Sequence, residues 1–145
     1  MAAATAIKPG SRAHTKTARI LLSVDSLAAL AVGLITLLIT PFLADLYGWT
    51  EGFTRFMAAV NIVYGSFSGV QAWLFLRHGR LFRPAVLLLV IANAAWIGHC
   101  FAQIWYLYDT ATIFGIAQLV LEAIFVGGLA ALEALYVLPL TDDRS

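Results

Sequence analysis

The chain has 145 residues, of which 61% are hydrophobic and 12% are charged, and its net charge is +1. Soluble domains are about 45–50% apolar and about 25% charged. This composition excludes a water-soluble globular enzyme, a disordered segment and a nucleic-acid-binding protein. A membrane-spanning helix needs about 20 apolar residues, so the length accommodates four such helices joined by short loops.

Four long apolar runs follow a polar, basic N-terminal segment. We predict helices over about residues 18–43, 53–77, 82–108 and 112–137. No run alternates between apolar and polar residues with period two, so strands are not expected. The predicted fold class is therefore all-α, a four-transmembrane-helix bundle. Residues 1–18 and 140–145 are expected to be cytoplasmic tails, and residues 19–139 the membrane domain.

The basic residues gather on one side of the predicted bundle. They precede the first helix or separate the second from the third: Lys8, Arg12, Lys16, Arg19, Arg77, Arg80 and Arg83. Asp45, Glu51 and Asp109 lie in the two other connections, where Arg55 is the only nearby basic residue. Cytoplasmic loops carry an excess of Lys and Arg. Both termini are therefore predicted to lie in the cytoplasm.

Each predicted helix carries one stripe of polar or small residues within an arc of about 60–120°. Membrane helices avoid polar side chains unless these face protein or water. We therefore expect the stripes to face one another and to form a ligand-binding site. The candidate ligand-binding residues are Asp25, Asn61, Tyr64, Gln71, Asn93, Trp96 and Gln103. Gly65 and Gly69 form a G-x-x-x-G pattern, which is typical of close helix packing.

The acidic residues and the one histidine of the spans are the candidates for chemistry. At 1.5 Å per residue, His99 and Glu122 are expected at a similar depth, about 18–22 Å from the cytoplasmic edge. They are our candidate catalytic residues, as an acid–base couple or proton relay. The alternative is a structural hydrogen bond between helices.

Two further carboxylates, Asp25 and Glu133, are predicted nearer the cytoplasm, at about 6–12 Å. Asp25 is expected to take a cation, a proton or a ligand amine, or to form a helix-to-helix hydrogen bond with Gln71 or Asn93. Glu133 lies on the polar stripe of the fourth predicted helix, and it is expected either to be a functional group of the interior or to lie near the lipid headgroups, within reach of Arg19 or Arg80.

No cofactor and no metal site are predicted. Cys100 is the only cysteine, so an intrachain disulfide and CxxC redox chemistry are excluded. His99 and Cys100 are adjacent and of metal-ligating type, but a zinc or copper site needs further ligands that the spans do not supply. A buried lone cysteine is usually a small apolar filler.

Several short patterns resemble those of small uncharacterised bacterial four-helix integral membrane proteins. They are Arg19 with Asp25, N-x-x-W at Asn93 and Trp96, and Gly115 and Gln118 followed by Glu133. The chain is also similar to DoxX-like proteins in size and layout. The resemblance implies four spans in a bacterial inner membrane, and it implies no functional residue.

The leading functional hypothesis is a small integral membrane protein with a polar intramembrane site for a small amphipathic or lipid-soluble ligand. If it is an enzyme, we expect an acid–base reaction of isomerase or cyclase type carried by His99 and Glu122. Two alternatives stay open: a small proton-coupled transporter with Asp25 or Glu122 as the carrier, and a structural or accessory subunit. Membrane lipids are expected partners, nucleic acid is not, and a homo-oligomer is left open.

Overall fold

The computed structural model describes residues 12–141, and these residues are helical with no sheet. The elements are α1 (Arg12–Leu38), α2 (Thr40–Tyr47), α3 (Glu51–His78), α4 (Arg83–Leu107), α5 (Ile113–Tyr136) and the 3-10 helix η1 (Leu138–Leu140). Among them, α1, α3, α4 and α5 are long and apolar enough to cross a membrane. The all-helical class with four candidate spans agrees with the prediction.

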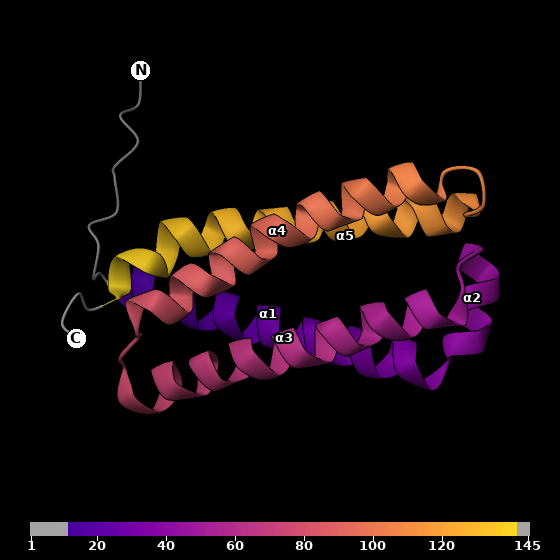
Figure 1. Ribbon diagram of the computed structural model, residues 1–145. Helices are drawn as coiled ribbons and strands as arrows, with labels where there is room; N and C mark the ends of the chain where they lie inside the picture. The colour runs from indigo at the N-terminus through magenta and orange to yellow at the C-terminus, as the bar shows by residue number, and fades with distance from the viewer. Residues whose placement is uncertain (1–11, 142–145) are drawn as a thin grey trace, which may run out of the picture.

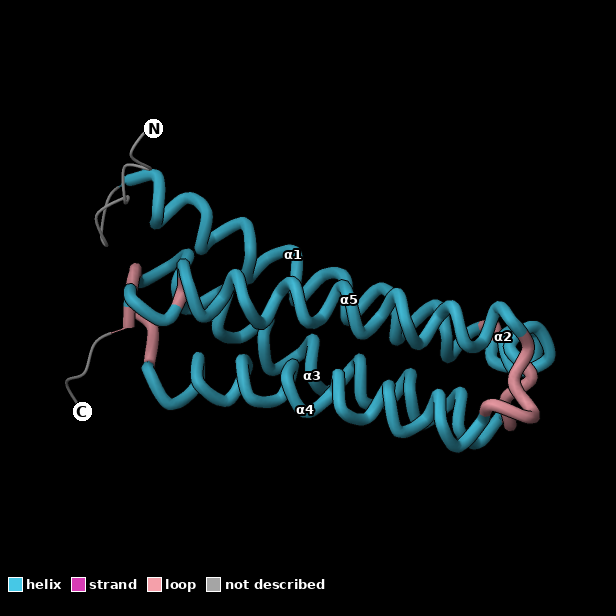
Figure 2. The backbone as a smooth tube through the Cα atoms, turned by 90° about the horizontal axis from the view of Figure 1, so that it is seen from above, coloured by secondary structure: helices cyan, strands magenta, loops and turns pink. Residues whose placement is uncertain are grey.

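The four long helices form two antiparallel pairs. Helix α1 packs most extensively against α3, and α4 against α5 (Figure 1). The start of α1, the loop between α3 and α4, and the end of α5 lie at one end of the bundle, whereas α2 lies at the other. In the view turned by 90°, α5 lies beside α1, so the two helix pairs pack side by side as a four-helix bundle (Figure 2). The two pairs contact each other less than the helices within each pair do.

The α1–α3 pair is close because glycines lie at its crossing. A Cβ atom added at Gly65 would lie 2.8 Å from the backbone nitrogen of Leu30 and 2.9 Å from its Cγ. One added at Gly33 would lie 2.9 Å from the carbonyl oxygen of Ala58. The Ser26 hydroxyl donates to the Gly65 carbonyl over 3.1 Å. The packing role predicted for the G-x-x-x-G pattern is therefore confirmed at Gly65.

The predicted first helix, 18–43, is wrong at both ends. It begins at Arg12, within the segment expected to be a tail, and it ends at Leu38. Pro41 cannot donate a backbone hydrogen bond and its ring obstructs the carbonyl four residues earlier. The Thr40 hydroxyl instead donates to the carbonyls of Thr36 and Leu37, over 2.9 and 3.0 Å. The Leu37 carbonyl, which Pro41 leaves without a backbone donor, thus accepts a hydrogen bond from the Thr40 side chain. The separate short helix α2 follows.

Helix α2 is held against the start of α5. The backbone N–H and the hydroxyl of Thr112 donate to the carbonyls of Tyr47 and Leu46, over 2.9 and 2.6 Å. The same hydroxyl accepts from the Gly115 N–H over 3.2 Å and so caps α5. Gly115 lies directly under the Tyr47 carbonyl, where a Cβ atom would collide. Helix α2 therefore covers one end of the bundle as a fixed part of it.

The remaining boundaries lie within one or two residues of the predicted ones. The predicted tails fall largely on residues 1–11 and 142–145, which lie outside the described residues. Two apolar clusters fill the bundle. One lies around Leu22, Leu89 and Val137, and the other around Trp49, Met57 and Leu119. Asp25 on α1 and Asn93 on α4 follow the residues of the first cluster along their helices. Both residues line a cavity between the helices.

Candidate intramembrane ligand site

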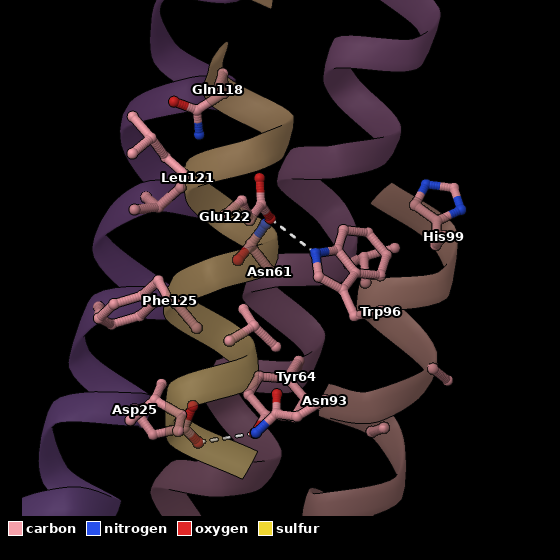
Figure 3. Close-up of a pocket in the computed structure, with 18 residues that line it drawn as sticks. Asp25, Asn61, Tyr64, Asn93, Trp96, His99, Gln118, Leu121, Glu122 and Phe125 are labelled. Carbon is pink, nitrogen blue, oxygen red and sulfur yellow. Dashed lines mark hydrogen bonds between the residues drawn. The ribbon is translucent and has the colours of Figure 1, made fainter. Parts of the chain in front are cut away.

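A cavity of about 520 Å³ lies between the two helix pairs and is lined by all four long helices. This volume falls within the range of about 300–1,000 Å³ that is typical of ligand pockets. Seven residues singled out from the sequence line it together (Figure 3): Asp25, Asn61, Tyr64, Asn93, Trp96, His99 and Glu122. The rest of the lining is apolar or small except for Gln118.

Asp25 and Tyr64 join α1 to α3 at one end of the cavity. The Tyr64 hydroxyl donates to the Asp25 carboxylate over 2.9 Å, and Asp25 is only 3% exposed. The helix-to-helix alternative for Asp25 named Gln71 or Asn93 as its partner, and the partner is wrong because the hydrogen bond comes from Tyr64. The tyrosine side chain is long enough to reach a carboxylate on the neighbouring helix, which residue spacing along one helix does not reveal.

Asn93 and Glu133 join α4 to α5 at the same level. The Asn93 amide donates to one Glu133 oxygen over 3.2 Å, and Glu133 is wholly buried. Its other oxygen, Oε1, has no hydrogen-bond partner. Of the two alternatives for Glu133, the position near the headgroups beside Arg19 or Arg80 is wrong, because Glu133 is buried inside the bundle.

Glu122 and His99 are separated by Trp96. The Trp96 indole N–H donates to the Glu122 carboxylate over 2.8 Å, as the dashed line in Figure 3 shows. The His99 ring stacks on Trp96 with centroids 4.7 Å apart and planes inclined by 24°. Among the described residues, no hydrogen bond joins His99 to Glu122, so the two side chains do not form the direct couple that we predicted. Both side chains still line one cavity, and His99 Nε2 has no partner.

Aromatic rings from α3 pack beside His99. The centroids of Phe56 and Phe53 lie 5.8 and 6.4 Å from that of His99. On the opposite side, the lining residues Leu121 and Phe125 of α5 are 63% and 48% exposed. These two side chains thus belong both to the cavity and to the outer apolar surface. The cavity reaches that surface beside α5.

A smaller cavity of about 230 Å³ continues toward α2. It shares Asn61, Gln118 and Glu122 with the larger one and ends at Tyr47 and Trp49. The Asn61 amide donates to the Met57 carbonyl over 3.0 Å, so its oxygen stays free to accept. Burial, together with the nearby Glu122 charge, raises the pKa of Tyr47 above its ordinary value. Tyr47 is therefore a neutral phenol at the covered end of the site.

Two predicted site residues do not line the cavity. Gln71 is buried one helix turn beyond Ser68, and Gln103 is half-buried beyond the cavity on α4. Both lie on the polar stripes of their helices, but each is too far along its helix. The sequence-based site also omitted the apolar wall formed by Leu121, Phe125 and Leu129. Apolar residues in a membrane span carry no signal that separates a cavity wall from a lipid contact.

No group of three or more His, Cys, Asp and Glu side chains suited to a metal occurs among residues 14–141. Cys100 is buried in the apolar cluster around Met57 and Leu119. Its position agrees with a filling role.

Comparison of the chain with protein-family models, with curated proteins and with solved structures finds no match. The resemblance to DoxX-like proteins therefore stays a prediction. Fold and cavity define the class: an all-helical protein with four helices suited to crossing a membrane and a polar cavity between them.

Proposed function

We propose that this chain is a small integral membrane protein whose intramembrane cavity binds a small or lipid-soluble ligand. The observation that carries the proposal is the cavity itself, in which polar groups from four helices converge inside an otherwise apolar wall. Polar side chains in a span are costly unless they face protein or a cavity. A few polar groups within a largely apolar lining are characteristic of small-molecule sites.

The orientation we propose has both termini and the α3–α4 loop in the cytoplasm of a bacterial cell. The start of α1 and this loop lie at one end of the bundle (Figure 1), and both carry the basic residues. A membrane-impermeant maleimide tests this orientation on single-cysteine variants of a Cys100→Ala background. Cysteine at Asp109 should react in intact cells, whereas cysteine at Arg80 should react only after the membrane is opened. The opposite pattern would reverse the topology.

Ligand binding in the cavity is tested with a substitution that fills the cavity and a matched substitution outside it. Ala92 lines the cavity, whereas Ala94, two residues along α4, is exposed outside it. Native mass spectrometry of protein purified in mild detergent should detect a bound hydrophobic molecule. Ala92→Leu should lower the bound fraction several-fold, and Ala94→Leu should leave it unchanged. Equal occupancy in both variants, or an empty wild-type protein, would contradict the proposal.

Glu122→Gln separates a binding role from a structural one, because the amide keeps the shape and much of the hydrogen bonding. If Glu122 serves a ligand, thermal stability should persist while the bound molecule is lost. If the variant keeps the bound molecule but melts earlier, Glu122 serves packing alone, and the accessory-subunit alternative gains.

The second candidate function is an acid–base enzyme that acts on the bound molecule. It is favoured by His99 Nε2, a proton donor or acceptor with no protein partner beside a cavity that also holds Glu122. A proton-transfer enzyme exchanges substrate hydrogen with water. The bound molecule should therefore gain deuterium in heavy water with wild-type protein, and fail to do so with His99→Asn. No exchange by wild-type protein would remove this candidate.

A further inference from the structure

The interior of the bundle holds three carboxylates and no cationic side chain paired with them. In the described part of the chain, Asp25, Glu122 and Glu133 have no Lys or Arg within salt-bridge distance; the ion pair found there is Arg55 with Glu51, on the surface. The guanidinium groups of Arg19 and Arg77 lie instead over the rings of Phe75 and Trp73. Within residues 12–141, no basic side chain therefore offers a counter-charge to these three carboxyl groups.

The hydrogen bonds to these carboxylates come from neutral donors. They are the Tyr64 hydroxyl, the Trp96 indole and the Asn93 amide. A carboxylate offers about four lone-pair sites, so acceptor capacity remains. Glu133, which is wholly buried and whose Oε1 has no partner, also keeps acceptor capacity but does not line the cavity.

The cavity supplies surfaces for both halves of an amphipathic molecule. Asp25 and Glu122 line it from opposite helix pairs, and the stacked rings of Trp96 and His99 lie beside Glu122. Aromatic faces attract cations, tryptophan most strongly. Leu121 and Phe125 form an apolar wall that continues to the outer surface, so an apolar body can enter from the lipid beside α5.

We infer that the ligand is an amphipathic cation, with an ammonium-class head group held at Glu122 beside the Trp96 ring and an apolar body along α5. This inference rests on the proposed function and adds the sign of the ligand's charge. A positive head group supplies the counter-charge that the protein interior lacks. A neutral ligand would leave the carboxylates uncompensated, and an anionic one would add a like charge.

A matched pair of probes tests the charge preference with full-length protein in phosphatidylcholine nanodiscs. The probes are trimethyl(phenylhexyl)ammonium and its uncharged isostere, in which carbon replaces nitrogen. Binding is followed by tryptophan fluorescence against protein-free nanodiscs. The cation should bind at least about tenfold more tightly, which corresponds to about 1.4 kcal/mol. Equal or tighter binding of the neutral isostere overturns the inference and leaves the proposed function standing; if neither probe binds, both fail.

Variants that neutralise one carboxylate each show which residue causes the preference for the cation. Glu122→Gln should weaken binding of the cation about tenfold or more, and Asp25→Asn should weaken it less. Both variants should leave binding of the neutral isostere unchanged, which also reports that each variant is folded. Glu51→Gln, which removes an exposed carboxylate, should alter neither. If both cavity variants bind the cation as tightly as wild-type protein does, the cation binds elsewhere and the inference is overturned. The selectivity of wild-type protein decides the question even if a variant fails to fold.

Discussion

The indole N–H of Trp96 on α4 donates to the carboxylate of Glu122 on α5 across 2.8 Å, inside the cavity wall. This bond joins the two helices of one pair and sets which face of the carboxylate remains open to the cavity. It also places an aromatic ring between Glu122 and His99. Trp96 therefore determines how both candidate catalytic groups are presented.

The first prediction concerns the energy of this bond. A double-mutant cycle with Trp96→Phe and Glu122→Leu isolates the pairwise contribution, because each single variant removes the hydrogen bond. Hydrogen bonds between membrane helices contribute about 0.6 kcal/mol on average and about 1.7 kcal/mol at most. We expect a coupling free energy within these values, measured by unfolding in dodecyl sulfate. A coupling near zero would show that the contact does not contribute to stability.

The second prediction concerns Asn93 and Glu133. Asn93→Leu removes the one donor to a wholly buried carboxyl group, so we expect a loss of about 1–3 kcal/mol in unfolding free energy. Replacing both partners by leucine removes the unsatisfied group as well. The double variant should regain much of the lost stability. If it unfolds as easily as the single variant, the hydrogen bond is not what makes Asn93 important.

The third prediction concerns the close crossing of α1 and α3. Gly65→Ala places a Cβ atom against the Leu30 backbone, which cannot shift without separating the helices. We expect a destabilisation of about 1–3 kcal/mol. Gly98 on α4 has open space around it, so Gly98→Ala should be neutral or stabilising by up to about 1 kcal/mol. Equal melting temperatures for the two variants would contradict this reading of the crossing.

The fourth prediction concerns the break between α1 and α2. Thr40→Val keeps the shape of the side chain but leaves the Leu37 carbonyl without the hydroxyl that replaces the missing N–H of Pro41. We expect a loss of about 1 kcal/mol. Ser66→Ala is the control, since the Ile62 carbonyl that Ser66 contacts lies inside a continuous helix. A thermal shift no larger than that of the control would count against the role of Thr40.

Much of the site was accessible from residue spacing. A helix of fixed period places Asp25 on one face and Asn93 with Trp96 on another, and polar groups in apolar spans avoid lipid. That these side chains face the interior of the bundle follows from these two facts. Gln71 and Gln103 satisfied the same spacing, yet the cavity does not extend to them. Angular position on a helix does not reveal where along its axis the packing closes.

The hydrogen-bond partners of the polar groups were harder to predict from the sequence. One alternative paired Asp25 with Gln71 or Asn93, but the donor is Tyr64, whose side chain spans more than a turn of helix. One alternative placed Glu133 at the headgroups, but it is buried and accepts a hydrogen bond from Asn93. Which donor reaches which carboxylate depends on the rotation and separation of the neighbouring helices. Those quantities are absent from the spacing within any single helix.

The amino-acid sequence suffices to predict an all-helical protein with four runs that can cross a membrane and one polar face on each. Run length and a helical period of 3.6 residues settle these features locally. The pairing of α1 with α3 through Gly65, the pairing of α4 with α5 and the cavity between the two pairs depend instead on tertiary packing. Cavities arise where side chains from different helices fail to fill the space between them, so they depend on all the helices at once.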